Sequence, residues 1–160
     1  MSTTQSEAAS AIQAGAVSIE EKKALARLYY EEIWSRGNTS ILSEIIAPQY
    51  IHHNPPFPEE ARGSEGLERI VALYRGAFPD LIIPVDGLIA ESDLVVVRWT
   101  ARGTHLGALM GMPPTGKTIR VSGMEVLRIV DGKIVEEWTN WDQLGLLQQL
   151  DAIPLPGGVV

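Results

Sequence analysis

The hydrophobic pattern of the chain changes near residue 80, and this change sets the fold class. Between Ser18 and Phe78, apolar residues recur every three to four positions, as on one face of a helix. Beyond that point, segments rich in Val, Ile, Thr and Trp have the character of strands, at 81–90, 94–105, 117–130 and 134–142. Helices followed by a meander of strands predict an α+β fold, with the helices on one face of an antiparallel sheet.

Three helices are expected ahead of these strands, over residues 18–37, 40–46 and 64–78. The first opens with a capping box, because Ser18 is followed three positions later by Glu21. Ser64 is the expected N-cap of the third helix. Prolines in the stretch 49–58 argue against a long strand there. Between the last two strands, Asp131-Gly132 predicts a type I′ hairpin turn.

Length and composition favour a single domain that handles small molecules. We expect one core over 18–152, between a disordered leader at 1–17 and a loose tail at 153–160. The chain has 13 Lys and Arg against 20 Asp and Glu, a net charge of −7, so neither nucleic acid nor an anionic membrane is an expected partner. It has no cysteine and no apolar run long enough to span a bilayer, which is compatible with a cytoplasmic protein.

Two motifs look functional but fit a structural role better. Residues 111–118, GMPPTGKT, match the phosphate-binding loop expression, yet a strand rather than a helix follows them, and two prolines remove amide donors. We therefore expect a hairpin loop. His52, His53 and His105 lack the spacing of a metal site, and adjacent residues of an extended segment point to opposite sides. Neither a metal nor another cofactor is expected.

Glu125 is the residue that the strand pattern leaves unexplained. The alternation from Ile119 to Ile129 places it on the apolar face of its strand. A buried carboxylate costs several kcal/mol unless it is paired, or else its pKa rises and it exchanges protons near neutrality. Glu125 is therefore a general acid or base facing a pocket, a partner of Arg98 or Arg120 in an ion pair, or a residue turned outward by a bulge.

Other polar and aromatic residues lie at the ends of strands. His105 closes the second predicted strand, in the sequence THLG, and either has a structural role or meets the strand of Glu125, depending on register. Asp142 either caps a final helix or contributes to the site. Three tryptophans on or beside strands are either core residues or the wall of a cavity, namely Trp99, Trp138 and Trp141.

The sequence contains, in order, YIHHNPPF, AFPD, a long run from Arg98 to Asp142, and QQLDAIP. Together these stretches resemble the SnoaL-like polyketide cyclase family of the nuclear transport factor 2-like superfamily, over about residues 20–152. The resemblance implies a conical α+β fold, in which about three helices and a curved antiparallel sheet enclose an apolar pocket, commonly in a dimer or tetramer. Well-known members resemble enzymes that close a ring in a polyketide ester by an intramolecular aldol reaction, without a cofactor.

The resemblance also assigns roles to particular residues. The catalytic carboxylate of the family, more usually Asp, falls on Glu125, and His105 is the candidate for a second catalytic group. By similarity to ketosteroid isomerase, that enzyme's first-helix tyrosine falls on Tyr30 and its base on Asn54, which has no titratable proton but can donate a hydrogen bond. Limonene epoxide hydrolase chemistry is not expected, since the matching positions hold no carboxylate and carry Arg98, Thr100 and Asn140.

Two functions remain. The first is a cyclase, or a related lyase or isomerase, acting on a small hydrophobic carbonyl compound: Glu125 removes a proton α to the carbonyl, and Tyr30, Asn54 and His105 stabilise the enolate. The second is a non-catalytic protein that binds an apolar ligand in the same pocket. A homodimer or homotetramer is expected in either case. The candidate substrate-binding residues are Asn54, Tyr30, His53, Arg98, Trp138 and Asp142.

Overall fold

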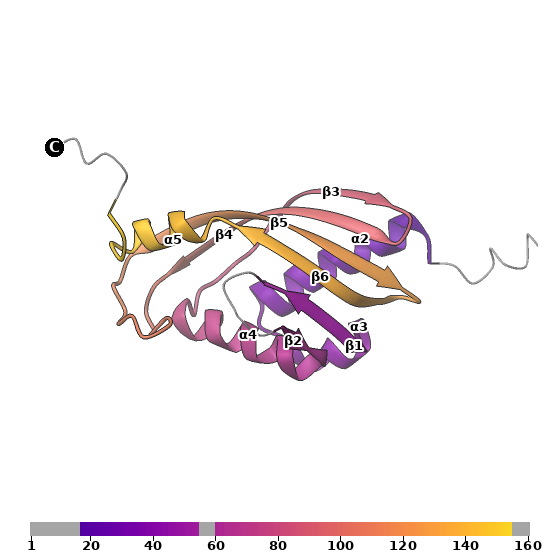
Figure 1. Ribbon diagram of the computed structural model, residues 1–160, viewed down its shortest axis with the longest axis horizontal. Coiled ribbons are helices and arrows are strands. Elements are labelled where there is room, and N and C mark those ends of the chain that lie inside the picture. The colour runs from indigo at the N-terminus through magenta and orange to yellow at the C-terminus, as the bar shows by residue number, and fades with distance from the viewer. Residues whose placement is uncertain (1–16, 55–59, 155–160) are drawn as a thin grey trace, which may run out of the picture.

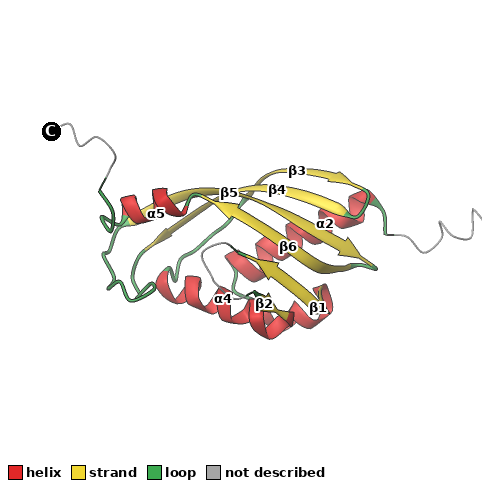
Figure 2. Cartoon of the chain, viewed as in Figure 1, coloured by secondary structure: helices red, strands yellow, loops and turns green. Residues whose placement is uncertain are grey.

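The computed structural model describes residues 17–54 and 60–154, which form a curved sheet with helices packed against it (Figures 1 and 2). The order of the strands across this sheet is β2-β1-β6-β5-β4-β3. The expected leader at 1–17 and tail at 153–160 lie outside the described residues, apart from Val17 and residues 153–154. The strands are β1 (Ile46–His53), β2 (Ala61–Arg62), β3 (Val85–Glu91), β4 (Leu94–Thr104), β5 (Thr118–Val130) and β6 (Lys133–Trp141).

The helices cover one face of the sheet. Helix α2 packs against β3 and β4, and α4 packs against β1. The burial of β5 reflects this arrangement, because its buried residues alternate with more exposed ones along the strand. The predicted α+β class is confirmed. The helical elements are α2 (Ile19–Leu28), η1, a π-helix (Tyr29–Ser35), η2, a 3₁₀ turn (Thr39–Ile41), α3 (Leu42–Ile45), α4 (Gly63–Ala77) and α5 (Gln143–Gln149).

The first helix begins as predicted and then changes its winding. The Ser18 side chain accepts a hydrogen bond from the Glu21 amide at 3.2 Å, and the Ser18 amide donates to the Glu21 carboxylate at 2.7 Å, which confirms the capping box. From Tyr29 the helix continues as the π-helix η1. Tyr29 and Tyr30 are both buried, with their rings in a T-shaped arrangement at a centroid distance of 5.3 Å. Two adjacent phenols therefore enter the core.

Strand β1 corrects the prediction that prolines prevent a long strand after residue 48. It runs for eight residues, from Ile46 to His53. Pro48 is tolerated within it because the pairing with β6 shifts register between Ile46 and Ile51. Strand β1 also runs parallel to β6, whereas β3 to β6 pair in the antiparallel manner expected. The sheet is consequently mixed.

The turns and helix ends give one confirmation and one correction. Asp131 and Gly132 have φ values of 50° and 74°, so the β5–β6 turn is of type I′ as predicted. This hairpin sets Glu125 opposite Thr139. Helix α4 has Arg62 rather than Ser64 at its N-cap position. Across the described residues, no helix is both long and apolar enough to cross a membrane.

Candidate active site

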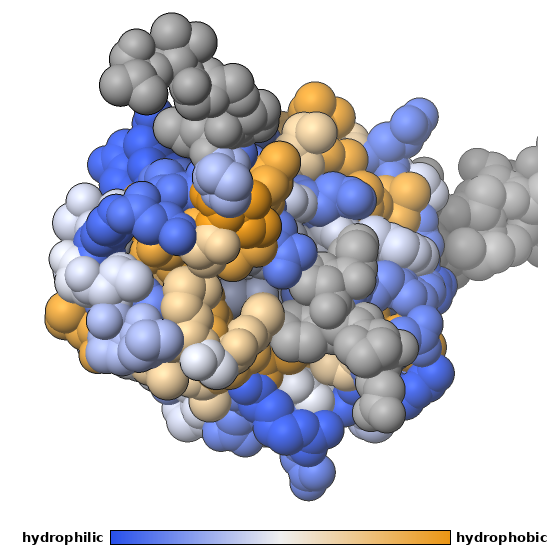
Figure 3. Space-filling model, turned by 60° about the vertical axis from the view of Figure 1, so that its left-hand side comes forward, coloured by the Kyte–Doolittle hydropathy of each residue, from blue (hydrophilic) through white to orange (hydrophobic). Residues whose placement is uncertain are grey.

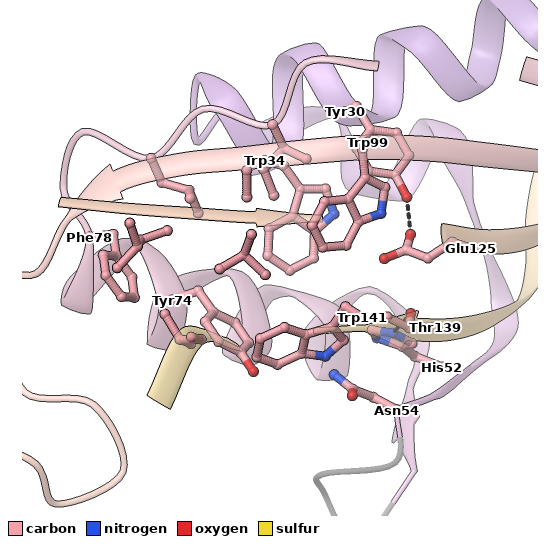
Figure 4. Close-up of a pocket in the computed structure, with 16 residues that line it drawn as sticks. Tyr30, Trp34, His52, Asn54, Tyr74, Phe78, Trp99, Glu125, Thr139 and Trp141 are labelled. Atoms are coloured by element: carbon pink, nitrogen blue, oxygen red, sulfur yellow. Dashed lines mark hydrogen bonds between the residues drawn. The ribbon is translucent and has the colours of Figure 1, made fainter. Parts of the chain in front are cut away.

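A cavity lies between the inner face of the sheet and the helices. Its two ends differ in chemistry, as Figure 4 shows: Phe78 and Tyr74 lie at one end, and Glu125, His52 and Asn54 at the other. Aromatic rings form much of the wall between them, from Trp34, Trp99 and Trp141. Aliphatic side chains complete it, from Leu81, Ile83, Ala101, Ile119, Val121 and Leu146. An apolar ligand with a polar group at one end matches this lining.

The apolar end of the cavity lies toward a part of the surface that is itself partly apolar. Helix α5 and the loop between β4 and β5 form one end of the molecule (Figure 1), and they expose Leu106, Met110 and Leu144. Figure 3 brings this end forward and shows apolar residues gathered near the middle of the face, among polar ones. Leu146, in the cavity wall, belongs to the same helix α5.

Glu125 projects from β5 into the polar end of the cavity. Its side chain is buried, and it accepts a hydrogen bond from the Tyr30 hydroxyl through Oε2 (Figure 4). Neither Arg98 nor Arg120 pairs with it, because both are exposed residues that alternate onto the other face of the sheet. Of the possibilities left open by the sequence, a carboxyl group facing a pocket is the one that the structure shows.

A second buried carboxyl group lies behind the first. Glu137 is two residues from Thr139 on β6, so it shares the inner face with Glu125. Its Oε2 accepts hydrogen bonds from the hydroxyls of Tyr29, at 2.9 Å, and Tyr50, at 2.5 Å. Its Oε1 is 3.9 Å from Nε2 of His52. Glu137 is fully buried and is not part of the cavity lining.

The two carboxyl groups differ in acidity. Burial raises the pKa of Glu125 well above its ordinary value, and the negative charge of Glu137 raises it further. Burial acts in the same direction on Glu137, but the nearby His52 ring and the hydrogen bonds from Glu125, Tyr50 and Tyr29 outweigh it and lower its pKa. The pKa values of the two carboxyl groups are therefore shifted in opposite directions.

Further polar groups surround this end of the cavity. Nε2 of His52 is 2.7 Å from the Thr139 hydroxyl, and both residues line the cavity. Within the described residues, buried polar atoms that lack a hydrogen-bond partner include Nδ1 of His52, Oδ1 of Asn54 and Nε1 of Trp99. A buried polar atom without a partner is costly, so these atoms are suited to bind polar groups of a ligand.

Comparison with known proteins identifies the family. The model of the SnoaL-like polyketide cyclase family matches residues 24–150. The chain belongs to the SnoaL-like polyketide cyclase family. This confirms the resemblance seen in the sequence and, with it, the nuclear transport factor 2-like fold.

Named relatives of this SnoaL-like chain include polyketide ester cyclases. It is 32% identical over 135 residues to aklanonic acid methyl ester cyclase DauD of Streptomyces sp. strain C5, covering 79% of this chain and 81% of that protein. It is 31% identical over 121 residues to nogalonic acid methyl ester cyclase of Streptomyces nogalater, covering 73% and 88%. The crystal structure of AclR from Streptomyces galilaeus, a suggested hydroxylase, has a TM-score of 0.75 and 34% identity, covering 88% and 87%.

Besides Glu125, two of the predicted catalytic and substrate-binding residues line the cavity of this SnoaL-like chain, and Trp99 and Trp141 form part of its wall. Tyr30 reaches it from the π-helix, and Asn54 reaches it from the end of β1. The other candidates lie elsewhere. Arg98 is exposed on the outer face, and Asp142 is an exposed N-cap whose carboxylate accepts from the Gly145 amide at 2.8 Å.

His52 lines the cavity, whereas His53, the neighbouring histidine predicted from the sequence to bind substrate, does not. His53 lies on the outer face of the sheet, where it is stacked on Trp138 at 5.4 Å and contacts Glu136 at 2.9 Å. His53 and Trp138 thus lie outside the cavity lining, and His52 occupies it instead. The reason is the period of the strand, which turns Tyr50, His52 and Asn54 inward together.

His105 is buried but is held in a loop. Its Nδ1 accepts a hydrogen bond from the Thr115 amide at 3.2 Å, and its ring lies against Phe78 at 5.3 Å. Its backbone pairs with Gly116 and Lys117. His105 is not part of the cavity lining. These contacts close the loop that contains GMPPTGKT, which runs from one strand to the next, without a helix after it, as expected.

Sequence reasoning missed Glu137, His52 and Thr139. A signal for Glu137 and Thr139 existed, because Val135, Glu137 and Thr139 alternate inward along β6 just as Glu125 does along β5. His52 could have been found only by recognising β1 as a strand.

Proposed function

We propose that the chain is a cofactor-independent cyclase that catalyses an intramolecular aldol-type condensation, or related lyase or isomerase chemistry, on a small hydrophobic carbonyl compound. The observation that carries the proposal is the position of Glu125: a buried carboxyl group at the polar end of an otherwise aromatic and aliphatic cavity. A carboxyl group with a raised pKa is suited to move a proton at carbon near neutral pH.

In the proposed reaction, the carboxylate form of Glu125 takes a proton from the carbon α to a carbonyl group. The resulting enolate carbon attacks a second carbonyl of the same molecule and forms the carbon–carbon bond that closes the ring. The new alkoxide then takes the proton back from Glu125. Atoms balance without an oxidant, a reductant or a co-reactant, so proton transfer is the only chemistry that the protein must supply.

Hydrogen-bond donors around Glu125 have the second role in this reaction. The Tyr30 hydroxyl already bonds to Glu125, and the Asn54 amide lies at the same end of the cavity. We assign the role proposed for His105 to His52, because His52 lines the cavity and His105 does not. Such donors stabilise the negative oxygen of an enolate.

The test is turnover by Glu125→Gln. General acid–base catalysis by one group contributes about 10²- to 10⁴-fold, so kcat should fall by that factor. Aklanonic acid methyl ester and nogalonic acid methyl ester, named for two relatives, are the compounds to assay first. Arg98→Gln is a matched control, because Arg98 is on the neighbouring strand and on the exposed face. Equal turnover by Glu125→Gln and Arg98→Gln would sink the mechanism.

The competing proposal is a non-catalytic ligand-binding protein. Both proposals expect a bound aromatic compound to change the fluorescence of Trp34, Trp99 and Trp141, which line the cavity. They differ over Glu125→Gln: an enzyme loses turnover and keeps binding, whereas a binding protein has no turnover to lose. Ligand titration followed by fluorescence, beside product analysis, separates the two.

We further propose that the chain acts in the cytoplasm as a homodimer or homotetramer. Support for assembly comes from the outer face of the sheet, where a row of residues crosses five strands in register. Ile89 in this row is 72% exposed. A second copy of the chain would cover such a face. The row is Ile89, Val96, Val126, Trp138 and His53.

A further inference from the structure

We propose that Glu137 is a positioning residue for the reaction: the buried carboxyl groups of Glu125 and Glu137 hold one proton between them, Glu137 carries the negative charge, and the proton rests on Glu125. The effect of Glu137 on catalysis rests on the proposed function. The shared proton itself is inferred from the geometry of the two carboxyl groups. Glu137 acts through Glu125, since it is not part of the cavity lining.

The geometry brings the two groups together in the interior of the protein. Glu125 is 4% exposed and Glu137 is 0% exposed. They project from adjacent antiparallel strands onto the same face, because Glu125 is opposite Thr139, two residues from Glu137. Two carboxylates this close in a low-dielectric interior cannot both ionise readily, so one of them keeps a proton.

The hydrogen bonds decide which group is charged. Oε2 of Glu137 accepts from two phenols, those of Tyr29 and Tyr50, and His52 is also near this carboxyl group. Glu125 has one phenol, Tyr30, and the Thr139 hydroxyl as its donors. A carboxylate is stabilised by each donor that it gains. Burial also raises the pKa of all three phenols, so they remain donors.

The second carboxyl oxygen of Glu137, Oε1, is the expected acceptor of a hydrogen bond from Glu125. Oε1 of Glu137 is buried and accepts none of these tyrosine hydrogen bonds. If Glu125 is protonated, its hydroxyl can donate a hydrogen bond to Oε1 of Glu137. A hydrogen bond from Glu125 is one of the causes that lower the pKa of Glu137. Tyr30 can then bond to the other oxygen of Glu125.

Several elements packed around the pair contribute groups that affect its charge. The π-helix gives Tyr29 and Tyr30, and β1 gives Tyr50 and His52. Strand β6 gives the Thr139 hydroxyl. Strand β4 sets the uncharged Val97 opposite Glu125. His52 is the one basic side chain among them within the described residues, at 3.9 Å from Oε1 of Glu137.

This arrangement determines when Glu125 can act as a base. At rest it is a carboxylic acid, poised to protonate an oxygen. The carboxylate needed to remove an α-proton forms as the pH rises through the raised pKa of Glu125. Removing the charge of Glu137 would let that carboxylate form at lower pH. Glu137 thereby sets the balance between the acid and base forms of Glu125.

Infrared spectroscopy of the whole chain with carbon-13-labelled glutamate tests the pair without any substrate. The carbonyl stretch of a protonated glutamate should be present at neutral pH, disappear in Glu125→Gln, and titrate at lower pH in Glu137→Gln than in the wild type. Glu136→Gln is the matched control: Glu136 is the neighbouring residue, bonds to His53 and Arg128 instead, and should leave the band unchanged.

Two results would overturn the inference: no protonated glutamate band at neutral pH, or a Glu125 band that titrates identically in Glu137→Gln and in the wild type. If Glu137→Gln does not fold, Tyr50→Phe examines the same pair, because Glu137 then loses a donor and its own protonated band should persist to higher pH. An unchanged Glu137 titration in Tyr50→Phe also contradicts the inference.

The pH profile of kcat/KM separates this inference from the proposed function. If both are right, the rise in kcat/KM with pH moves to lower pH in Glu137→Gln and not in Glu136→Gln. If Glu125→Gln abolishes turnover while the wild type lacks the infrared band, the function stands and the shared proton does not. If the band behaves as expected and no methyl ester is turned over, the pair stands and the function fails.

Discussion

Gly123 leaves the space in which the indole ring of Trp99 lies, and adding one methyl group there should distort the cavity. Gly123 is directly opposite Trp99 across β4 and β5. A Cβ atom at residue 123 would be 2.3 Å from Cζ2 and 2.6 Å from Cη2 of that ring. Trp99 is 5% exposed and lines the cavity, so Gly123→Ala must push its ring out of place.

The cost follows from these distances. Carbon atoms in favourable contact are about 3.5–4.0 Å apart, so the ring must retreat by roughly 1.2 Å or more. Forcing an extra methyl group into a packed interior costs about 1–3 kcal/mol. With a urea dependence of about 1–3 kcal/mol per molar, the midpoint of unfolding should fall by roughly 1 M.

Urea unfolding followed by circular dichroism and tryptophan fluorescence measures this loss. Gly87→Ala is the matched control, since Gly87 also lies in a strand and a Cβ atom there would meet no atom within 4 Å. The midpoint of Gly87→Ala should stay close to that of the wild type. If Gly123→Ala unfolds at the same urea concentration as Gly87→Ala and binds ligands equally well, the role given to Trp99 as a wall of the cavity is wrong.

Three further predictions concern charge, the loop and assembly. The raised pKa of Glu125 gives stability that is fully present below its ordinary value of 4.5 and is lost as the pH rises through the folded-state pKa. The unfolding free energy of Glu125→Gln relative to the wild type should therefore increase from acidic to alkaline pH in urea titrations, and a constant difference would contradict the burial of a neutral carboxyl group. His105→Ala removes the acceptor of the Thr115 amide and should lower the unfolding free energy by about 1–3 kcal/mol, with kcat changed far less than in Glu125→Gln. Ile89→Glu places a charge on the outer face and should shift the mass measured by light scattering toward the monomer, whereas an unchanged mass would exclude this face as the interface.

The sequence predicted the position of Glu125 because β5 alternates without interruption up to that residue. The register shift in the β5–β6 pairing comes only after Arg128, so it does not disturb the inward direction of Glu125. The type I′ turn was equally local, since two residues determine its backbone. The direction of Glu125 and the type I′ turn could therefore be predicted, because each depends only on residues close to it in the sequence.

The parts that were missed depend on contacts between distant segments. Pro48 concealed β1, and without that strand the inward direction of His52 could not be predicted. The pairing of Glu137 with Tyr29 and Tyr50 joins residues 108 and 87 positions apart. His105 was placed correctly at the end of a strand, but its direction is set by Thr115, on the far side of the loop.

The most direct test of the account is hydrogen exchange at carbon. A methyl ester that binds the protein is incubated in deuterated water, and deuterium at the carbon α to the carbonyl is followed by mass spectrometry or NMR. The wild type should accelerate exchange, and Glu125→Gln should lose about 10²- to 10⁴-fold of that acceleration while its ligand affinity is retained. Equal exchange with both proteins would show that Glu125 does not move the proton.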